Sequence, residues 1–359
     1  MKFFVHPDIA QAETISTEVY TSESVYQDAK EKVFSSGWHF VGDTDLVKDP
    51  GMVYPFTLLE NYLDEPLLLS RDKKGDLHCL SNVCTHRGNI LINQPCTLHQ
   101  LQCRYHGRRF QLDGNFSHMP EFQQVENFPT KRDDLTALLL FQWGKWLFTS
   151  LDNSASPEMY LKDMMDRMAW LPLDTFHFRP DLSKDYAVEA NWALYCENFL
   201  EGFHIPFVHA GLNASIDYGS YATELFAHSS LQLALAKEGE MAFDIPPSSP
   251  DFGKRVGGYY FWIFPNMMFN FYPWGLSVNI VIPAGVSKSI VSFLTYVCDE
   301  TKLEQGAGSD LLRVELEDEE VVQAVQKGIR SRFYTHGRYS VTREQGTHHF
   351  HRLLAASLE

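Results

Sequence analysis

Two short stretches of this chain each offer one thiol and one imidazole at close spacing. The first is Cys84–His86 (C-x-H), and after sixteen intervening residues it is followed by Cys103–His106 (C-x-x-H). Thiolates and imidazoles bind transition metals, and two such pairs on two loops complete a four-ligand site. We therefore predict a metal centre here. Its predicted ligands are Cys84, His86, Cys103 and His106.

Two kinds of metal centre use this set of ligands. A structural zinc ion takes two cysteines and two histidines, whereas a Rieske-type [2Fe–2S] cluster has two cysteines on one iron and two histidines on the other. One Cys and one His in each loop, with Gly88 and Gly107 close behind the histidines, favours the cluster. Glycine lets backbone amides approach the bridging sulfides, and such hydrogen bonds tune the reduction potential. The remaining cysteines, interpreted as buried thiols, are Cys79, Cys96, Cys196 and Cys298.

A second group of possible metal ligands lies in residues 191–209. Glu201 and His204 are three residues apart, so on a helix they would share one face. His209 is five residues beyond His204. On an unbroken helix, the side chain of His209 would point away from that of His204. Pro206 lies between the two histidines and is expected to distort or end the helix. Such a break would bring the second imidazole round to the same metal.

Two histidines and one carboxylate make a facial triad, which leaves open positions for O₂ on Fe(II). Carboxylates are abundant in residues 315–320, and Asp318 is the one that lies among the apolar positions of the predicted helix. An aspartate on a buried face is costly unless it is paired or metal-bound. Asp318 is therefore the predicted third ligand, and stabilisation by the helix dipole is the alternative. The apolar positions are Val314, Val321, Val322, Val325 and Ile329.

The sequence pattern changes twice along the chain, from a helical segment to short strand-like runs and then to a mixture of helices and strands. This predicts two domains. We expect an N-terminal arm at residues 1–36, a small β domain at 37–153 and a larger domain at 154–359, with a linker at 154–157. Helices are expected at 25–34 and 311–331, and His348–His351 is interpreted as a structural strand. Strands are expected at 38–41, 52–58, 66–70 and 146–148, within 256–283, and at 287–297.

Composition excludes several functions. Thirty Lys and Arg against 46 Asp and Glu give a net charge of −16, which argues against a nucleic-acid partner and an anionic membrane surface. We see no signal peptide and no apolar run of the length of a membrane span. The protein is therefore expected to be cytoplasmic, and its cysteines to serve metal binding or burial rather than disulfides.

Residues 37 to about 150 resemble Rieske [2Fe–2S] domains. Cytochrome-bc-type Rieske proteins carry an extra cysteine in each loop, and this chain has Asn89 and Tyr105 at those places. It therefore resembles the ferredoxin and oxygenase branch. Oxygenases commonly have Trp after the His-Gly of the second loop, whereas this chain has Arg108 and Arg109. Those arginines are expected either to bind a reductase or a neighbouring subunit, or to form a solvated basic patch.

Residues 198–209 resemble the catalytic domain of Rieske oxygenase α subunits. Asn198, Glu201, His204 and His209 match the family pattern in register. The resemblance implies an α+β fold, with the antiparallel Rieske domain inserted in a helix-grip-like catalytic domain whose antiparallel sheet is flanked by helices. It implies mononuclear Fe(II) on His204, His209 and Asp318, and catalytic roles for Asn198 and Glu201. Glu201 would link His204 to His106 of the next subunit in a head-to-tail homotrimer.

Further features resemble the carnitine, choline and glycine-betaine oxygenase branch. These are Glu rather than Asp at Glu201 and the segments 264–268, 273–275, 325–328 and 348–352. That branch implies a small quaternary ammonium substrate and N-demethylation or C-hydroxylation. The aromatic residues between Tyr259 and Trp274 suit a methylated cation through cation–π attraction.

Electrons would come from another polypeptide, because no flavin or nicotinamide fingerprint is found. The expected partner is an NAD(P)H-dependent reductase, with or without a ferredoxin. Two alternatives remain open: a ring-hydroxylating or O-demethylating oxygenase of aromatic substrates, and a Rieske electron-transfer protein without oxygenase activity. Mono- and dioxygenation are not distinguished.

Overall fold

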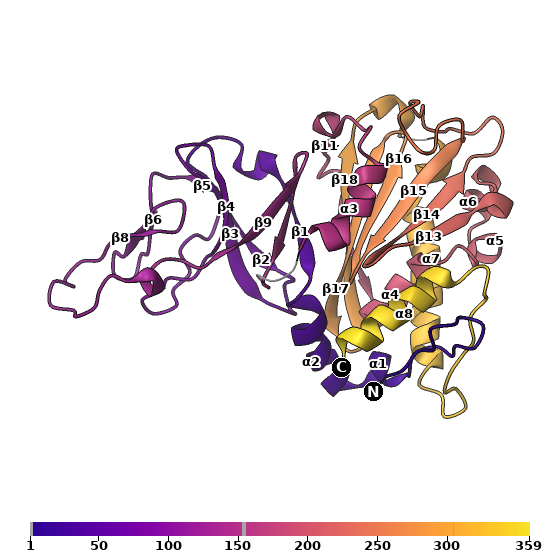
Figure 1. Cartoon of the computed structure of the whole chain (residues 1–359), viewed down its shortest axis with the longest axis horizontal. Helices are drawn as coiled ribbons and strands as arrows, with labels where there is room; N and C mark the ends of the chain where they lie inside the picture. The colour runs from indigo at the N-terminus through magenta and orange to yellow at the C-terminus, as the bar shows by residue number, and fades with distance from the viewer. Residues whose placement is uncertain (1–2, 153–155, 304) are drawn as a thin grey trace. The chain divides into compact units, whose positions relative to one another are not determined.

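The computed structural model of the chain describes residues 3–152, 156–303 and 305–359 (Figure 1). These residues form two compact units, one of residues 35–155 and one that joins residues 1–34 to 156–359. The β unit is therefore an insertion in the sequence of the other. Residues 154 and 155 of the predicted linker at 154–157 lie outside the described residues.

The smaller unit consists of antiparallel β-sheet. A seven-stranded sheet has the order β1-β10-β9-β4-β3-β2-β5, and a three-stranded sheet has the order β6-β7-β8. Each predicted strand of this region is present, at the predicted bounds or one to two residues longer. The strands are β1 (Trp38–Asp43), β2 (Met52–Leu58), β3 (Glu65–Arg71), β4 (Leu77–Ser81), β5 (Cys96–Thr97), β6 (Leu101–Gln102), β7 (Arg109–Phe110), β8 (Phe116–His118), β9 (Ala137–Trp143) and β10 (Trp146–Ser150).

The larger unit is built on an eight-stranded antiparallel sheet. Its order is β11-β18-β17-β16-β15-β14-β13, and β12 also pairs with β18. Nearly every residue of β14 to β16 is buried, which explains their continuous runs of aromatic and aliphatic residues. The strands are β11 (His177–Phe178), β12 (Lys184–Val188), β13 (Ala222–Leu225), β14 (Ser229–Leu235), β15 (Val256–Ile263), β16 (Met267–Tyr272), β17 (Gly275–Gly285) and β18 (Lys288–Val297).

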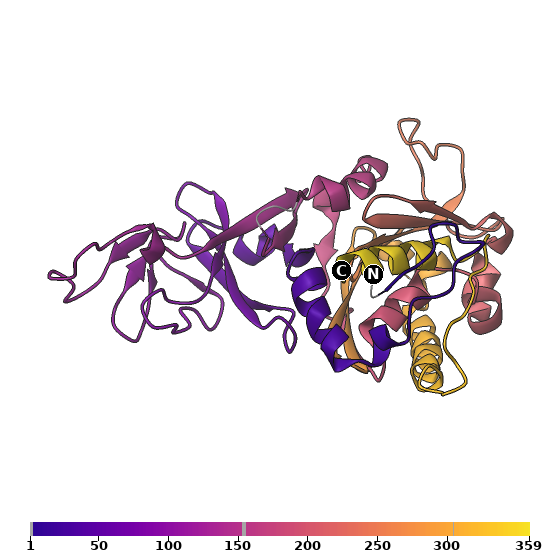
Figure 2. The same cartoon turned by 60° about the horizontal axis from the view of Figure 1, so that its bottom comes forward.

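Helices pack against this sheet, which confirms the predicted α+β class. Helix α4 contacts α7, α8 and β17, and α3 contacts β14 and β15 (Figures 1 and 2). The predicted N-terminal helix is α2 continued by a π-helical turn, η1 (Lys30–Phe34). The α-helices are α1 (Glu18–Thr21), α2 (Glu23–Ala29), α3 (Glu158–Arg167), α4 (Trp192–Phe199), α5 (Ile205–Val208), α6 (Ala210–Ser215), α7 (Leu311–Gly328) and α8 (Gln345–Ser357). Among the described residues, no helix is long and apolar enough to cross a membrane.

The strand predicted at residues 348–351 is wrong, because these residues lie in α8. On a helix, His348 and His351 are neighbours on one face, and both are buried. His351 Nε2 lies 3.0 Å from Glu197 Oε1 on α4, and His348 Nε2 lies 2.8 Å from the carbonyl oxygen of His6. The histidines therefore tie α8 to α4 and to the N-terminal segment.

The start of α8 meets the end of α4 without room for a side chain. A Cβ atom on Gly346 would lie 2.2 Å from the carbonyl oxygen of Leu200, so backbone must move to accept one. We expect Gly346→Ala to destabilise the protein by about 1–3 kcal/mol because a well-packed interface is overfilled. Thermal unfolding of the variant and the parent measures the change.

Gly328→Ala is the matched control. This helical glycine has no atom within 4 Å of a built Cβ among the described residues, so its replacement should be neutral or stabilising by up to about 1 kcal/mol. Equal stability of the two variants would show that the contact between α8 and Leu200 is not tightly packed.

Candidate active site

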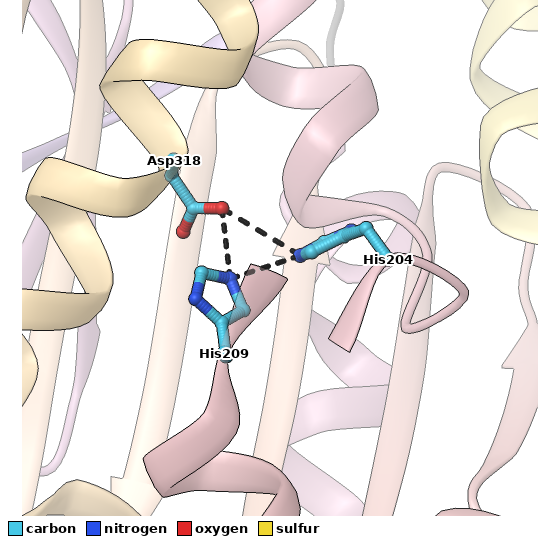
Figure 3. A group of neighbouring side chains, drawn as sticks. All are labelled: His204, His209 and Asp318. Carbon is cyan, nitrogen blue, oxygen red and sulfur yellow. Dashed lines mark hydrogen bonds and ion pairs between the residues drawn. The ribbon is translucent and has the colours of Figure 1, made fainter. Parts of the chain in front are cut away.

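Three side chains from two distant segments of the larger unit point toward one another. His209 Nε2 lies 3.2 Å from His204 Nε2 and 3.0 Å from Asp318 Oδ1, and His204 Nε2 lies 3.6 Å from the same oxygen (Figure 3). The structure thus brings together the three predicted ligands of the mononuclear site. Two imidazole nitrogens and one carboxylate oxygen that converge on one point are the donor set of a facial triad, which suits Fe(II).

The local structure that delivers the two histidines differs from the prediction. The helix predicted to carry both Glu201 and His204 is wrong, because α4 ends at Phe199. Pro206 lies in the first turn of the short helix α5, where its missing N–H leaves no bond unmade. His204 immediately precedes α5 and His209 immediately follows it. One helical turn between the histidines, rather than a kink at the proline, brings the imidazoles together.

Two further residues singled out in the sequence hold the ligands in place. The side-chain amide of Asn198 donates to Asp318 Oδ1 over 2.6 Å, which orients the carboxylate. His204 Nδ1 lies 2.7 Å from Glu201 Oε1, and the other oxygen of Glu201 accepts from the His204 amide over 3.2 Å. An Nδ1–H donated to a carboxylate leaves Nε2 free to bind a metal.

Glu317 supports the second histidine, and the sequence analysis missed it. His209 Nδ1 lies 2.8 Å from Glu317 Oε2, and Arg313 Nε donates to the other oxygen over 3.0 Å. Burial disfavours a charged His209, but its bonds to Asp318 and Glu317 prevail and raise its pKa. The bond from His209 is the main reason that the pKa of Glu317 is lowered. Its position beside the predicted ligand Asp318 was the available signal.

The buried face of α7 also differs from the prediction. Val325 is 42% exposed, whereas Glu315 is 2% exposed and lies on the buried face with Val322 and Gln326. The apolar stripe that pointed to Asp318 was therefore partly wrong. Asp318 nevertheless reaches the histidines because it lies at the margin of the buried face.

A cavity of about 110 Å³ adjoins the two histidines and Asp318. The hydroxyl of Tyr195 donates to Glu315 Oε2 in its wall. Burial raises the pKa of Glu315 to about 8. Asn198 and the acidic Glu201 also border the cavity. The lining further includes aromatic side chains (Tyr221, Tyr260, Tyr272, Phe293) and neutral polar ones (Gln232, Asn270, Ser277, Asn279).

The four predicted cluster ligands of the β unit also lie together. Cys84 and Cys103 are both buried, and the rings of His86 and His106 are 4.7 Å apart. Burial raises the pKa of the Cys84 thiol, and the adjacent Cys103 adds to the shift. Nδ1 of His106 is buried without a hydrogen-bond partner among the described residues. An unpaired buried nitrogen beside two thiols fits an iron–sulfur cluster that binds through these atoms.

Tight turns close both cluster loops. Gly88 and Gly107 have φ angles of +70° and +74°, which residues with a Cβ rarely adopt. Their N–H groups donate over 3.0 Å to the carbonyl oxygens of Cys84 and Cys103. The glycines are therefore needed to form the turns, and their own amides are engaged with the loop.

The expectation for Arg108 as a docking or solvated residue is wrong. Its side chain is 2% exposed and pairs with Asp133 over 2.7 Å. Its guanidinium also lies 5.0–5.7 Å from the ring centres of Phe110, Phe116 and Phe128, within cation–π distance. Arg108 thus belongs to the interior of the β unit, whereas Arg109 is exposed as expected.

Comparison with known proteins identifies both units. The family described as "Ring hydroxylating alpha subunit (catalytic domain)" matches residues 173–359, and "Rieske [2Fe-2S] domain" matches residues 37–129. The chain belongs to the Rieske-type ring-hydroxylating oxygenase α-subunit family. The family recognition made from the sequence is therefore confirmed, and so are its two cofactors, a [2Fe–2S] cluster and a mononuclear iron. The protein is an iron-dependent oxidoreductase that uses O₂.

Several relatives of this oxygenase are named for quaternary ammonium substrates. It is 28% identical to a choline monooxygenase of Arabidopsis thaliana over 98% of this chain and 84% of the relative. It is 26% identical to a carnitine monooxygenase oxygenase subunit of Escherichia coli over 96% of this chain and 94% of the relative.

Solved structures share the fold of this oxygenase. A quaternary ammonium Rieske monooxygenase in complex with L-carnitine superposes with a TM-score of 0.77 at 22% identity, covering 99% of this chain and 97% of the other. A naphthalene 1,2-dioxygenase reaches 0.71 at 16% identity, covering 97% and 92%.

The contacts of Arg108 predict a large effect on the Rieske unit. We expect Arg108→Ala to destabilise that unit by about 2–4 kcal/mol, because it removes a buried ion pair and three aromatic contacts. The change in stability is measured from the temperature at which the cluster loses its visible absorption. Arg109→Ala, an exposed neighbour, should unfold like the parent. If Arg108→Ala and Arg109→Ala unfolded at the same temperature, the buried placement of Arg108 would be in error.

The bond between Glu317 and His209 predicts a weaker metal site. We expect Glu317→Gln to lower affinity for the mononuclear iron about 10- to 100-fold, because His209 loses the carboxylate that orients it. Iron retained after dialysis against graded chelator measures the change. Glu320→Gln, an exposed site on the same helix, is the control and should retain iron like the parent. Unchanged retention in Glu317→Gln would show that the orientation of His209 does not depend on this bond.

Proposed function

We propose that this oxygenase hydroxylates a small quaternary ammonium compound at a carbon near its nitrogen. The observation that carries the proposal is the cavity beside His204, His209 and Asp318, which combines several tyrosine rings with the buried carboxyl of Glu315. Aromatic faces and a carboxylate attract a methylated cation. The names of the relatives, choline and carnitine monooxygenases, support the same class of substrate.

We propose that His204, His209 and Asp318 hold the mononuclear iron, and that the pairs Cys84/His86 and Cys103/His106 hold the cluster. When bound, the cluster supplies electrons and the iron activates O₂. The protein's part is positioning: carboxylates hold both imidazoles with Nε2 toward the metal. Asn198 holds the ligand oxygen of Asp318.

Glu201 is the proposed electron link between subunits. Its bond to His204 Nδ1 places it directly behind a ligand of the iron site. In the proposed head-to-tail homotrimer, Glu201 also accepts from His106 of the neighbouring subunit. A solved relative is described in terms of inter-subunit electron transfer. The other proposed partner is a separate NAD(P)H-dependent reductase, with or without a ferredoxin, and the proposed location is the cytoplasm.

Two outcomes are consistent with hydroxylation at a carbon near the nitrogen. One oxygen atom enters a C–H bond, and the second leaves as water with two electrons and two protons. Hydroxylation of an N-methyl group gives a hemiaminal, whose C–N bond breaks to release formaldehyde, a tertiary amine and a proton. Hydroxylation of a carbon that already bears a hydroxyl gives an aldehyde hydrate.

A single-turnover experiment tests the proposed substrate class. The iron-replete protein is reduced without air, mixed with quaternary ammonium compounds or aromatic acids, and then exposed to O₂. We expect formaldehyde or another aldehyde from at least one ammonium compound, in an amount close to the reduced sites. Oxidation of aromatic compounds only would overturn the substrate class, and no oxidation with about two irons per chain would favour an electron carrier.

Replacement of Asp318 tests the assignment of the metal sites. We expect Asp318→Ala to lower the iron content from about three to about two per chain, because a facial triad that loses its carboxylate binds iron weakly. The visible spectrum of the cluster should stay unchanged, since its ligands lie in the other unit. Asp310→Ala, which removes the N-cap carboxylate of the same helix, is the control and should keep the full iron content. Retention of all iron by Asp318→Ala would assign the third ligand elsewhere.

A further inference from the structure

We propose that Glu315 is a substrate-specificity residue, the counter-charge of the substrate's cation, and that the cavity selects ammonium cations that carry no carboxylate. The inference rests on the proposed function and deepens it. It divides the candidate substrates into choline-like cations, which the cavity accepts, and betaine- or carnitine-like zwitterions, which it disfavours.

Glu315 has an unused hydrogen-bonding atom in the cavity wall. The side chain is 2% exposed, and its Oε2 accepts from the hydroxyl of Tyr195. Its Oε1 is buried and has no hydrogen-bond partner among the described residues. It is not one of the three converging ligand atoms, which belong to His204, His209 and Asp318. A buried carboxyl with one free oxygen is costly unless a ligand compensates it. Burial raises the pKa of Glu315 to about 8, so the carboxyl is largely protonated in the empty cavity at neutral pH, and a cation bound beside it favours the ionised form.

The position of Glu315 on α7 matches the geometry that N-methyl chemistry requires. It lies three residues before Asp318, so the two Cβ atoms are about 5–6 Å apart on the same side of the helix. A reacting methyl group must approach the metal ligands, and its nitrogen is one bond farther away. Because Glu315 borders the same cavity as the three proposed ligands, the positive charge can lie near Glu315 when a methyl group is in place to react.

Aromatic rings complete the surroundings expected for a cation. Tyr260 on β15 and Tyr272 on β16 lie with their ring centres 5.8 Å apart, and both border the cavity. Tyrosine faces attract ammonium groups, and a nearby carboxylate strengthens the attraction in a site from which water is excluded. The sheet thus supplies rings and α7 supplies the charge.

The same lining disfavours a carboxylate on the substrate. Among the described residues that border the cavity there is no lysine or arginine, whereas three are acidic: Glu201, Glu315 and Asp318. Away from the proposed iron, a substrate carboxylate in this cavity of about 110 Å³ meets no cationic side chain, and the ionised Glu315 is a like charge. Neutral groups such as Asn270 and Gln232 can receive a hydroxyl at the same place.

A ligand series on the unmodified protein tests the selection. Binding to the oxidised, iron-replete protein is measured by calorimetry without reductant, so that no turnover is needed. The ligands are choline, glycine betaine, which has a carboxylate in place of the hydroxymethyl group, and 3,3-dimethylbutan-1-ol, the neutral isostere of choline. We expect choline to bind at least about tenfold more tightly than either of the others. Equal or tighter binding of glycine betaine would overturn the inference.

A matched pair of variants tests the residue. Glu315→Gln keeps the size of the side chain and an acceptor for Tyr195 but removes the charge, and Glu320→Gln removes an exposed charge from the same helix. We expect the first to weaken choline binding about tenfold or more, with no change for the neutral isostere, and the second to change neither. Equal loss for choline and the isostere would indicate a structural role and overturn the charge assignment.

The two proposals fail in different experiments. If no ammonium compound is oxidised, the proposed function fails, whatever the binding series shows. If ammonium compounds are oxidised but those with a carboxylate bind as well as choline, only the inference on Glu315 fails. Should Glu315→Gln not fold, the comparison of choline with glycine betaine on the parent protein still decides the selection.

Discussion

The larger unit is organised around one constraint: the three proposed metal-binding atoms must meet at one point although they come from two segments more than a hundred residues apart. Two imidazole nitrogens and a carboxylate oxygen lie 3.0–3.6 Å from one another. Without a cation at their centre, such polar atoms would be held together at a cost, so the surrounding structure must prevent them from separating. Every other feature of the site is arranged to meet that requirement.

The constraint is met by a second layer of hydrogen bonds from rigid elements. Helix α4 supplies Asn198 to the carboxylate of Asp318, and α7 supplies Glu317 to His209. The two helices are in contact, and α8 packs so closely on the end of α4 that Gly346 has no room for a side chain. The proposed metal ligands are therefore positioned by packing distant from the site as well as by their direct partners.

In the Rieske unit, the ligand side chains are brought together by residues that are close to them in the sequence. Its proposed cluster ligands come from two short loops that tight turns close at Gly88 and Gly107. The loops rest on a hydrophobic cluster that contains Cys84 and Cys103 themselves. Arg108 adds a buried ion pair with Asp133 and contacts with aromatic rings to the interior of this unit. The proposed ligands of this centre are close together in the sequence. Their spacing alone was therefore enough to predict the centre.

The sequence by itself determined the family, the α+β class, most strands and the two motifs that hold the proposed metal ligands, because these follow from spacing and local pattern. Only the tertiary structure decided which partners the motifs meet. It ended α4 before Glu201, made residues 348–351 helical, and buried both Arg108 and Glu315. Burial depends on which surface covers a residue, and that surface comes from segments far along the chain. Local periodicity does not contain this information, so charged residues that the fold buries were the ones misjudged.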